Sequence, residues 1–316
     1  MQPPPDEFDI DSIQVDMRAD PGDPPSVMID RTTPITIIGA GALGQALARS
    51  LHAAGRTVEL VVSRSDERGQ ALADAVGAQR ATTPDGISKK AIILCVPDDH
   101  IETVASQLDA PTDGIVAHCA GSRGLNVLKS PASKGSHVGS IHPVMVLAMA
   151  GRGPEALQGA TAAIEGDEVS GPWLTSLAQD IGMRAVEIPP ENRALYHLSA
   201  AMVGGLMTGL LAAAADLWQL VGLERSTAVT ALAPMVREAG RNLEELGVPD
   251  VVMGPAARGD TGTIQRHLEV LGHHAPHLLP LYRELALLSI PYACEQGLLD
   301  SKTAGELRNL IENNDQ

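Results

Sequence analysis

The sequence contains very few aromatic residues: one phenylalanine, two tryptophans and three tyrosines among 316 residues. Proteins that bind single-stranded nucleic acid stack its bases on aromatic side chains, and this chain has few to offer. Positive charge is also scarce, because 23 Lys and Arg stand against 39 Asp and Glu and the formal net charge is −16. A field of that sign repels a phosphate backbone. The composition therefore argues against a nucleic-acid partner.

Cysteine is sparse as well. Cys95, Cys119 and Cys294 lie far apart in the sequence, without CxxC or metal-ligand spacing. An odd, scattered set favours reduced thiols in a cytoplasmic protein over a disulfide framework. The histidines between residues 273 and 277 lack acidic or cysteine partners, so we expect no metal site.

The chain also lacks clear targeting and membrane signals. Residues 1–30 are acidic and Pro-rich without an apolar core, which predicts a disordered tail and not a signal peptide. Residues 198–215 carry no charge, and 18 residues is the lower limit for a membrane span. They are mostly small, with no flanking basic cluster, so we expect a buried helix of a soluble protein and no membrane partner.

From residue 34 onward, short apolar segments alternate with amphipathic ones, the pattern of a parallel sheet with crossover helices. The expected strands are 35–38, 57–62, 91–96, 114–119, 138–141, 161–164 and 184–188. The expected helices are 42–54, 66–76, 98–108 and 171–181.

After residue 188 the pattern becomes helical. Residues 191–221 are apolar on nearly every face of one long helix, which implies burial on all sides. Further helices are expected at 225–246, 261–272, 276–296 and 301–313. The predicted fold class is α/β, a Rossmann-type, mostly parallel sheet domain followed by an all-helical C-terminal domain. We place the tail at 1–30, the sheet domain at 31–188 and the helical domain at 189–316.

A glycine-rich loop joins the first expected strand to the first expected helix. Its residues are Gly39, Ala40, Gly41, Ala42, Leu43 and Gly44. In a GxGxxG loop the first glycine permits the tight turn, the second lets backbone approach a pyrophosphate, and the third lets helix and strand pack closely. The helix N-terminus then attracts the anion, even in an acidic protein. The alternative is a glycine-rich turn without a ligand.

The second expected strand indicates which dinucleotide is bound. An NAD-specific site carries an acid at the end of this strand, but Glu59 falls inside it. Ser63, Arg64 and Ser65 follow the strand and suit a 2′-phosphate. We therefore expect NADP(H), with NAD(H) less favoured, although Arg64 as a solvated loop charge is the alternative.

Two later strands end at the same carboxyl edge of the sheet. Val96 and Pro97 close one of them, and His118 closes the next. Ligands of such sheets bind at this edge, so we predict that all three residues contact the cofactor. Asp98 follows Pro97 and could also lie at the cofactor, but a role as a helix cap explains it equally well.

Six motifs resemble a known group of proteins. They lie at 39–44, 95–98, 117–121, 141–143, 195–197 and 254–268. The chain resembles the superfamily of pyrroline-5-carboxylate reductase, ketopantoate reductase and 6-phosphogluconate dehydrogenase. More closely, it is similar to Rossmann-like NADP oxidoreductases of deazaflavin-dependent type with a C-terminal domain of unknown function. The resemblance implies a homodimer formed around the long helix.

The chain departs from this group in the long helix. Gly204, Gly205 and Leu206 stand where the group tends to carry a polar Ser-Asn pair, and the Lys-x-x-x-Asn pair of hydroxyacid dehydrogenases is absent from the sequence. This difference favours the alternative of a non-catalytic NADP-binding regulator or scaffold.

Four residues are candidates for chemistry. His197 suits a proton donor because histidine titrates near neutral pH, though a core histidine is an equal alternative. Arg258 suits a substrate carboxylate, and Asp260 and His267 complete a polar cluster with it. An ion pair between Arg258 and Asp260, with Asp260 capping a helix, is the structural alternative.

The leading hypothesis is an NADP-dependent oxidoreductase for a small carboxylate-bearing keto acid or imine, including a ketopantoate-like one. A third reading is hydride exchange between NADP and a deazaflavin.

Overall fold

The computed structural model describes residues 29–148, 151 and 153–313. All but the last two residues of the predicted tail lie outside these ranges. The chain forms two compact units, Met1–Ala200 and Ala201–Gln316. The predicted domain boundary at 188/189 precedes this division, because the helix that begins at Arg193 is held on the first unit by its first residue, whose side chain is buried there.

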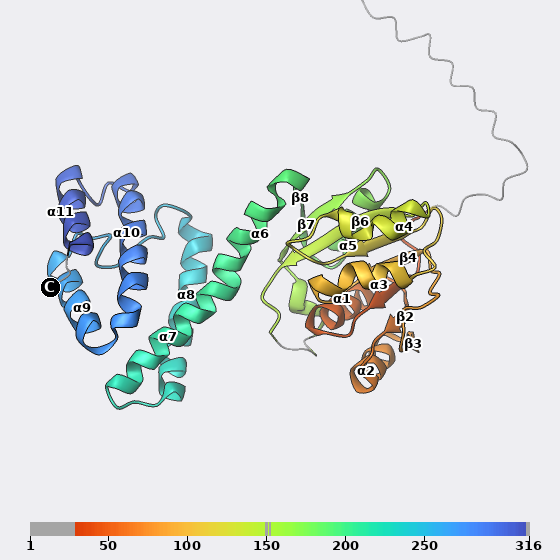
Figure 1. The fold of residues 1–316 in the computed structure, drawn as a ribbon, viewed down its shortest axis with the longest axis horizontal. Coiled ribbons are helices and arrows are strands. Elements are labelled where there is room, and N and C mark those ends of the chain that lie inside the picture. Colours follow the sequence, from red (N-terminus) through yellow and green to blue (C-terminus); the bar gives the residue numbers. More distant parts are fainter. Residues whose placement is uncertain (1–28, 149–150, 152, 314–316) are drawn as a thin grey trace, which may run out of the picture. The chain divides into compact units, whose positions relative to one another are not determined.

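The first unit contains an eight-stranded sheet (Figure 1). Its strands are β1 (Ile35–Ile38), β2 (Val58–Val62), β3 (Gln79–Ala81), β4 (Ala91–Leu94), β5 (Ile115–His118), β6 (His137–Val144), β7 (Thr161–Gly166) and β8 (Arg184–Glu187). Their order is β3-β2-β1-β4-β5-β6-β7-β8, and every neighbouring pair is parallel except β6 and β7. The predicted Rossmann-type, mostly parallel sheet is confirmed.

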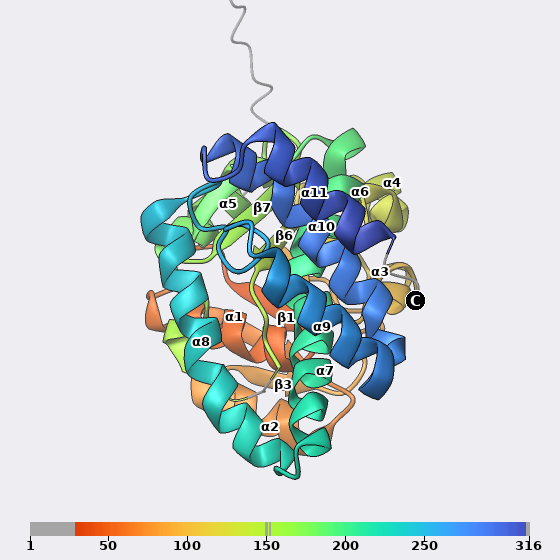
Figure 2. The same cartoon turned by 90° about the vertical axis from the view of Figure 1, so that its left-hand side faces the viewer.

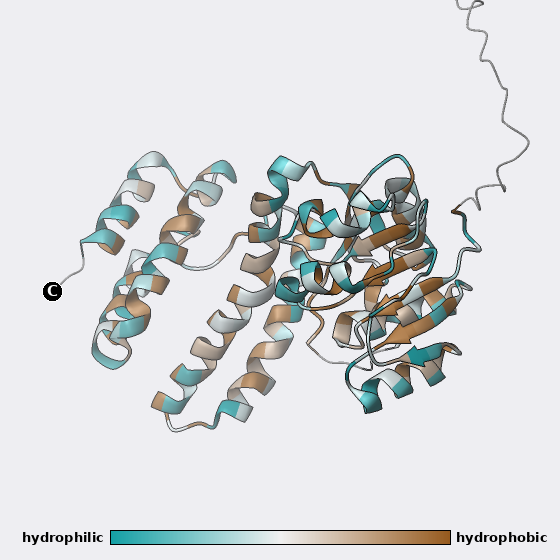
Figure 3. Ribbon diagram, turned by 45° about the vertical axis from the view of Figure 1, so that its right-hand side comes forward, coloured by the Kyte–Doolittle hydropathy of each residue, from teal (hydrophilic) through white to brown (hydrophobic). Residues whose placement is uncertain are grey.

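Helices cover both faces of this sheet. They are α1 (Ala42–Ala53), α2 (Asp66–Val76), α3 (Ile101–Gln107), α4 (Lys129–Ser133) and α5 (Ser170–Asp180), with short turns η2 (Asp98–His100), η3 (Leu125–Leu128) and η4 (Pro154–Leu157). Ile37 packs in one core cluster with α1, α2 and α5, whereas Ile38 packs in another with α3. Successive residues of a strand face opposite sides, so the buried run of β1 supplies both cores. Most of the strands are coloured as hydrophobic in Figure 3.

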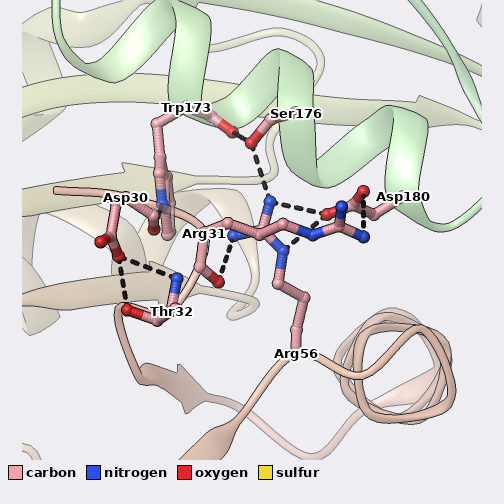
Figure 4. A network of polar contacts seen from close by, with 7 residues as sticks. All are labelled: Asp30, Arg31, Thr32, Arg56, Trp173, Ser176 and Asp180. Carbon is pink, nitrogen blue, oxygen red and sulfur yellow. Dashed lines mark hydrogen bonds and ion pairs between the residues drawn. The ribbon is translucent and has the colours of Figure 1, made fainter.

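A buried arginine connects several segments at the amino ends of β1 and β2 (Figure 4). Arg56, just before β2, donates to the carboxylate of Asp180 at 2.6 Å, to the Arg31 carbonyl at 2.8 Å and to the Ser176 hydroxyl at 2.9 Å. Its side chain is 1% exposed. A buried guanidinium needs several acceptors, and these three join the approach to β1 with the end of α5.

The remaining helices follow β8. After a short turn, η5 (Pro190–Asn192), they are α6 (Arg193–Ala201), η6 (Met202–Leu206), α7 (Met207–Leu220), α8 (Arg225–Leu246), α9 (Thr261–His274), α10 (Leu279–Glu295) and α11 (Ser301–Glu312), with the turn η7 (Pro276–Leu278) before α10. Helices α9, α10 and α11 are labelled in Figure 2. They share a core that includes Ile264, Ile290 and Leu307. The predicted all-helical second part is confirmed.

The long helix differs from its prediction in burial. It runs through α6, η6 and α7, and η6 is one π-helical turn. Only 6% of an 18-residue window in Pro190–Leu220 is buried, and Leu198, Val203 and Leu206 are each more than half exposed. The expectation of burial on all sides is wrong for a single chain, because apolar periodicity does not say which surface covers a helix. By length and composition this helix could also cross a membrane.

Candidate functional site

The glycine loop between β1 and α1 has the geometry that its sequence predicts. Gly39 has a φ of 114°, and a Cβ there would lie 2.2 Å from the Cys95 carbonyl oxygen. A Cβ on Gly44 would lie 1.9 Å from the Gly39 carbonyl oxygen, but one on Gly41 would meet no atom within 4 Å. Two glycines are therefore required by the fold, and Gly41 faces open space. This is the pattern expected where backbone must approach a phosphate.

A cavity of about 880 Å³, here called the glycine-loop cavity, opens beside this loop. It is lined by the ends of β1, β2 and β4, by residues 82–84 and by α3, and its wall includes Gly39, Ala40, Gly41, Val96 and Pro97. Helix α1 begins at this point with no acidic residue in its first turn. The N-terminus of α1 is thus free of internal negative charge and suits an anionic ligand.

The loop after β2 supplies basic and hydroxyl groups to this cavity. Arg64 is exposed at its wall, and so is Arg68, one turn into α2. The Ser63 hydroxyl bonds the backbone of Ser65, whose own hydroxyl accepts from the Arg68 backbone N–H and caps α2. The two serines therefore shape the loop, while the two guanidiniums supply its positive charge.

Two acids near this loop have cationic partners. Asp66, the first residue of α2, pairs with Arg80. Glu59 lies inside β2 and pairs with Lys89 at 2.8 Å. Glu59 thus lies inside the strand, as the sequence predicts, and its charge is paired with Lys89. The positive charges of Arg64 and Arg68 at the end of the strand are therefore not cancelled by Glu59.

A second cavity of about 260 Å³, here called the histidine cavity, lies at the same sheet edge. Its lining includes Leu43 of α1, Gly121, His142 of β6 and His197 of α6. A Cβ on Gly121 would come within 2.8 Å of both imidazoles, so this glycine lets the two rings approach the backbone. The ring centroids are 6.1 Å apart. Of these two histidines, only His197 was a sequence-based candidate for chemistry.

A tyrosine orients one of these histidines. The Nδ1 atom of His142 lies 2.8 Å from the hydroxyl of Tyr196. Burial, followed by the charges of His197 and Arg193, lowers the pKa of His142 to about 4. Burial raises the pKa of Tyr196. Near neutral pH the His142 imidazole is therefore uncharged, and its Nδ1 atom shares one hydrogen bond with the Tyr196 hydroxyl.

Arg193 anchors the helix that carries Tyr196 and His197. Its side chain is 4% exposed, and its Nη1 lies 2.5 Å from the Glu165 carboxylate of β7. Its Nη2 donates to the Ala120 carbonyl at 2.9 Å and the Ser140 hydroxyl at 2.7 Å. Sequence reasoning missed this residue, because its partners lie on distant strands.

Of the other residues near this edge of the sheet, His118 lines neither cavity, whereas Asp98 lines the histidine cavity. His118 is fully buried, lines neither cavity, and accepts from the Ala120 N–H at 3.1 Å. Burial, then Arg193, lowers its pKa to about 4, so it is neutral near pH 7. Asp98, for which a helix cap was the alternative, lines the histidine cavity and accepts from the Ser122 hydroxyl at 2.7 Å.

Three further predicted residues belong to the second unit. Asp260 caps α9 by accepting from the Thr263 N–H at 3.0 Å, and His267 Nδ1 lies 2.8 Å from the Tyr282 hydroxyl. Arg258 is exposed. Catalytic roles for Arg258, Asp260 and His267 stay predictions. Within residues 29–148, 151 and 153–313, there is no group of three or more His, Cys, Asp or Glu side chains that could hold a metal.

Two family models match the chain. The model described as "NADP oxidoreductase coenzyme F420-dependent" matches residues 34–120, and that described as "Domain of unknown function (DUF2520)" matches residues 160–288. No curated protein matches the chain in sequence.

Solved structures share the fold. A candidate NADP oxidoreductase from Bacteroides fragilis is 25% identical, with a TM-score of 0.64 over 82% of this chain and 98% of its own. A Thermotoga maritima protein is 23% identical, with a TM-score of 0.62 over 83% and 99%. A pyrroline-5-carboxylate reductase from Coxiella burnetii is 19% identical, with a TM-score of 0.54 over 87% and 98%. The chain therefore carries an NADP oxidoreductase-type domain at residues 34–120 and a DUF2520 domain at residues 160–288.

Proposed function

We propose that the protein uses NADPH to reduce the carbonyl or imine of a small carboxylate-bearing compound, such as a keto acid or a cyclic imine. The observation that carries this proposal is the histidine cavity. Its wall combines Leu43, from the glycine-loop helix, with the imidazoles of His142 and His197. A reacting double bond held there would meet proton-bearing groups beside the cofactor loop.

The residues of the chain divide the work as follows. Gly41 and the N-terminus of α1 hold the pyrophosphate, and Ala42, Leu43, Val96 and Pro97 shape the cofactor site. NADPH supplies the hydride when it is bound.

The neutral His142, oriented by Tyr196, presents its Nε2–H to the substrate oxygen or nitrogen and polarises the double bond. His197 delivers the proton that this atom gains when the hydride reaches carbon.

The first test is turnover. Purified protein with NADPH is mixed with 2-keto acids, cyclic imines and a deazaflavin, and NADPH absorbance is followed. With an accepted substrate, His142→Asn should lower kcat by about a hundredfold and leave the NADPH Kd unchanged, because His142 does not line the glycine-loop cavity.

The outcomes separate the competing functions. NADPH binding without turnover of any acceptor would favour a non-catalytic regulator. Turnover of the deazaflavin alone would favour exchange between two hydride carriers. Equal kcat values for the wild-type protein and His142→Asn would remove His142 from the chemistry.

We also propose that Arg64 and Arg68 read the 2′-phosphate of NADP(H). Charge-assisted hydrogen bonds contribute about 1.5–3 kcal/mol each. The double variant Arg64→Ala/Arg68→Ala should therefore bind NADPH at least about tenfold more weakly and bind NADH unchanged, as measured by calorimetry.

Glu59→Gln is the matched control, because Glu59 pairs with Lys89 inside the strand. We expect it to leave the preference for NADPH intact. An equal loss of NADPH and NADH affinity in the arginine variant would instead point to damage to the loop as a whole.

The exposed long helix supports a homodimer. Helix α7 buries only Ala215, and α8 buries only Ala228, whereas α9–α11 have their own core. Large exposed apolar surfaces mark association sites. We propose that a second copy covers this helix in the cytoplasm, with the open Gly205 and Gly209 allowing close approach.

Light scattering tests the dimer. The wild-type protein should have twice the monomer mass, and Val203→Glu/Leu206→Glu should be a folded monomer, because charges in an apolar interface are strongly disfavoured. Leu298→Glu, at a site 54% exposed outside the long helix, is the control and should remain dimeric. A monomeric wild type, or a protein soluble only with detergent, would contradict the proposal.

A further inference from the structure

Two cysteines lie side by side at the sheet edge that forms the proposed cofactor site. Cys95 follows β4 and Cys119 follows β5, and these neighbouring parallel strands end in register, with Leu94 opposite His118. The two Sγ atoms are 3.7 Å apart. The Cys119 N–H bonds the Leu94 carbonyl at 3.2 Å, so the backbones remain paired up to the thiols. The function proposed above makes no use of this pair.

The backbone spacing suits a covalent bond between them. Neighbouring strands lie about 4.8 Å apart, within the Cα separation of about 4.4–6.8 Å found in disulfides. Rotation of the side chains, with a small backbone shift, would bring the sulfurs to bonding distance. We propose that Cys95 and Cys119 form a reversible disulfide when the protein meets a peroxide, and that this bond weakens dinucleotide binding.

The exposure of the two thiols assigns their order of reaction. Cys95 lines the glycine-loop cavity and is partly exposed, whereas Cys119 is 5% exposed. The hydrogen bond with Cys95, and then burial, raise the pKa of the Cys119 thiol. A peroxide therefore reaches Cys95 first, and Cys119 is the resolving thiol.

The reaction is balanced with one peroxide. The Cys95 thiolate attacks a peroxide oxygen, an S–O bond forms, the O–O bond breaks, and hydroxide leaves. Hydroxide takes the proton that Cys95 lost, which gives the first water. The Cys119 sulfur then attacks the Cys95 sulfur, the S–S bond forms and the S–O bond breaks. The departing hydroxide takes the Cys119 proton as the second water. The two sulfurs lose two electrons, and a thiol reductant reverses the change.

The glycine loop contacts Cys95, so a disulfide at Cys95 would change the position of the loop. A Cβ on Gly39 would lie 2.2 Å from the Cys95 carbonyl oxygen, and one on Gly44 would lie 3.2 Å from the Cys95 Cβ. The loop is thus packed on Cys95. A shift of Cys95 toward Cys119 would therefore displace the atoms on which the loop packs. Because coupling between two sites is reciprocal at equilibrium, bound NADPH should also make the disulfide less stable relative to the two thiols.

The experiment compares reduced and peroxide-treated forms of the same full-length protein. After alkylation of free thiols, a protease that cuts at Asp98 and Asp109 separates the two cysteines, so only a disulfide keeps their fragments joined. We expect joined fragments in the wild type and in Cys294→Ser, but not in Cys119→Ser. Calorimetry should show NADPH affinity about tenfold lower after oxidation, restored by dithiothreitol.

This effect on affinity rests on the proposed NADPH site, but the cross-link does not. Absence of joined fragments in folded, peroxide-treated wild type would overturn the inference even if the reduced protein binds NADPH. Joined fragments with unchanged affinity would overturn its effect on binding. A reduced protein that binds neither nucleotide would refute the proposed function, while the fragment assay would still decide on the disulfide.

Discussion

Gly41→Ala should weaken NADPH binding strongly while the protein stays as stable as the wild type. An added Cβ at this position meets no protein atom within 4 Å, and the backbone φ of −75° suits alanine. The methyl group would occupy the space in which the pyrophosphate approaches the N-terminus of α1. Loss of charge-assisted bonds to the phosphates should cost about 1.5–3 kcal/mol, or about tenfold to a hundredfold in Kd.

Gly44→Ala is the informative contrast within the same loop. Its Cβ would lie 1.9 Å from the Gly39 carbonyl oxygen, so α1 and β1 would have to separate. Overpacking in a core costs about 1–3 kcal/mol, and more where backbone must move. We therefore expect a lower melting temperature and lost NADPH binding together.

Gly272→Ala is the control for both variants. Gly272 lies exposed in α9, where alanine should stabilise the helix by about 0.5–1 kcal/mol. Calorimetry and thermal unfolding on the three variants separate binding from folding. Unchanged NADPH affinity in Gly41→Ala would mean that no phosphate lies against this glycine, and the cofactor site would have to be sought elsewhere.

These glycines also show which features a sequence can predict. The loop, β1 and α2 are local patterns, and the bounds expected for β1, α2 and α8 agree with the structure. The edge strand β3 was missed because it is three residues long with a polar sequence. Strand β6 extends beyond the expected end at Ile141, because pairing with β7 continues through Pro143 to Val144.

The candidate site was predictable only where its parts are close in sequence. His142 and Tyr196 are 54 residues apart, and no local pattern predicts that they meet. Arg68 was missed because it looks like an ordinary charge on α2, and its place in the cavity wall depends on how α2 packs. The long helix was predicted as a helix, but the sequence did not predict that its apolar surface is exposed in the single chain. A sequence does not show whether an apolar face packs against its own chain or against another molecule.

Arg193→Met should destabilise the protein by about 3–5 kcal/mol, because removal of one partner of a buried ion pair leaves an uncompensated charge. Here that charge is Glu165, whose side chain is 10% exposed. The substitution also leaves the Ala120 carbonyl and the Ser140 hydroxyl without their guanidinium donor. Chemical denaturation measures the loss.

A double variant separates the ion pair from its role in the site. Arg193→Met/Glu165→Met removes both buried charges, and such apolar replacements recover most or all of the stability. Turnover should nevertheless stay low, because the start of α6 would no longer be tied to the loop after β5 and to β6. Tyr196 and His197 follow directly on that helix. We expect a reduced kcat with an unchanged NADPH Kd, since the glycine-loop cavity does not include Arg193.

The double variant thus distinguishes a positioning residue from a purely structural one. If full stability returned together with full kcat, Arg193 would serve only the fold, and the proposed alignment of the two histidines would not depend on it. If the single variant Arg193→Met were as stable as the wild type, the buried pair with Glu165 would not hold α6 on the sheet. The geometry predicts that the double variant regains stability but keeps a low kcat. Stability requires only that neither buried charge is left unpaired, whereas turnover requires Tyr196 and His197 at their positions beside His142.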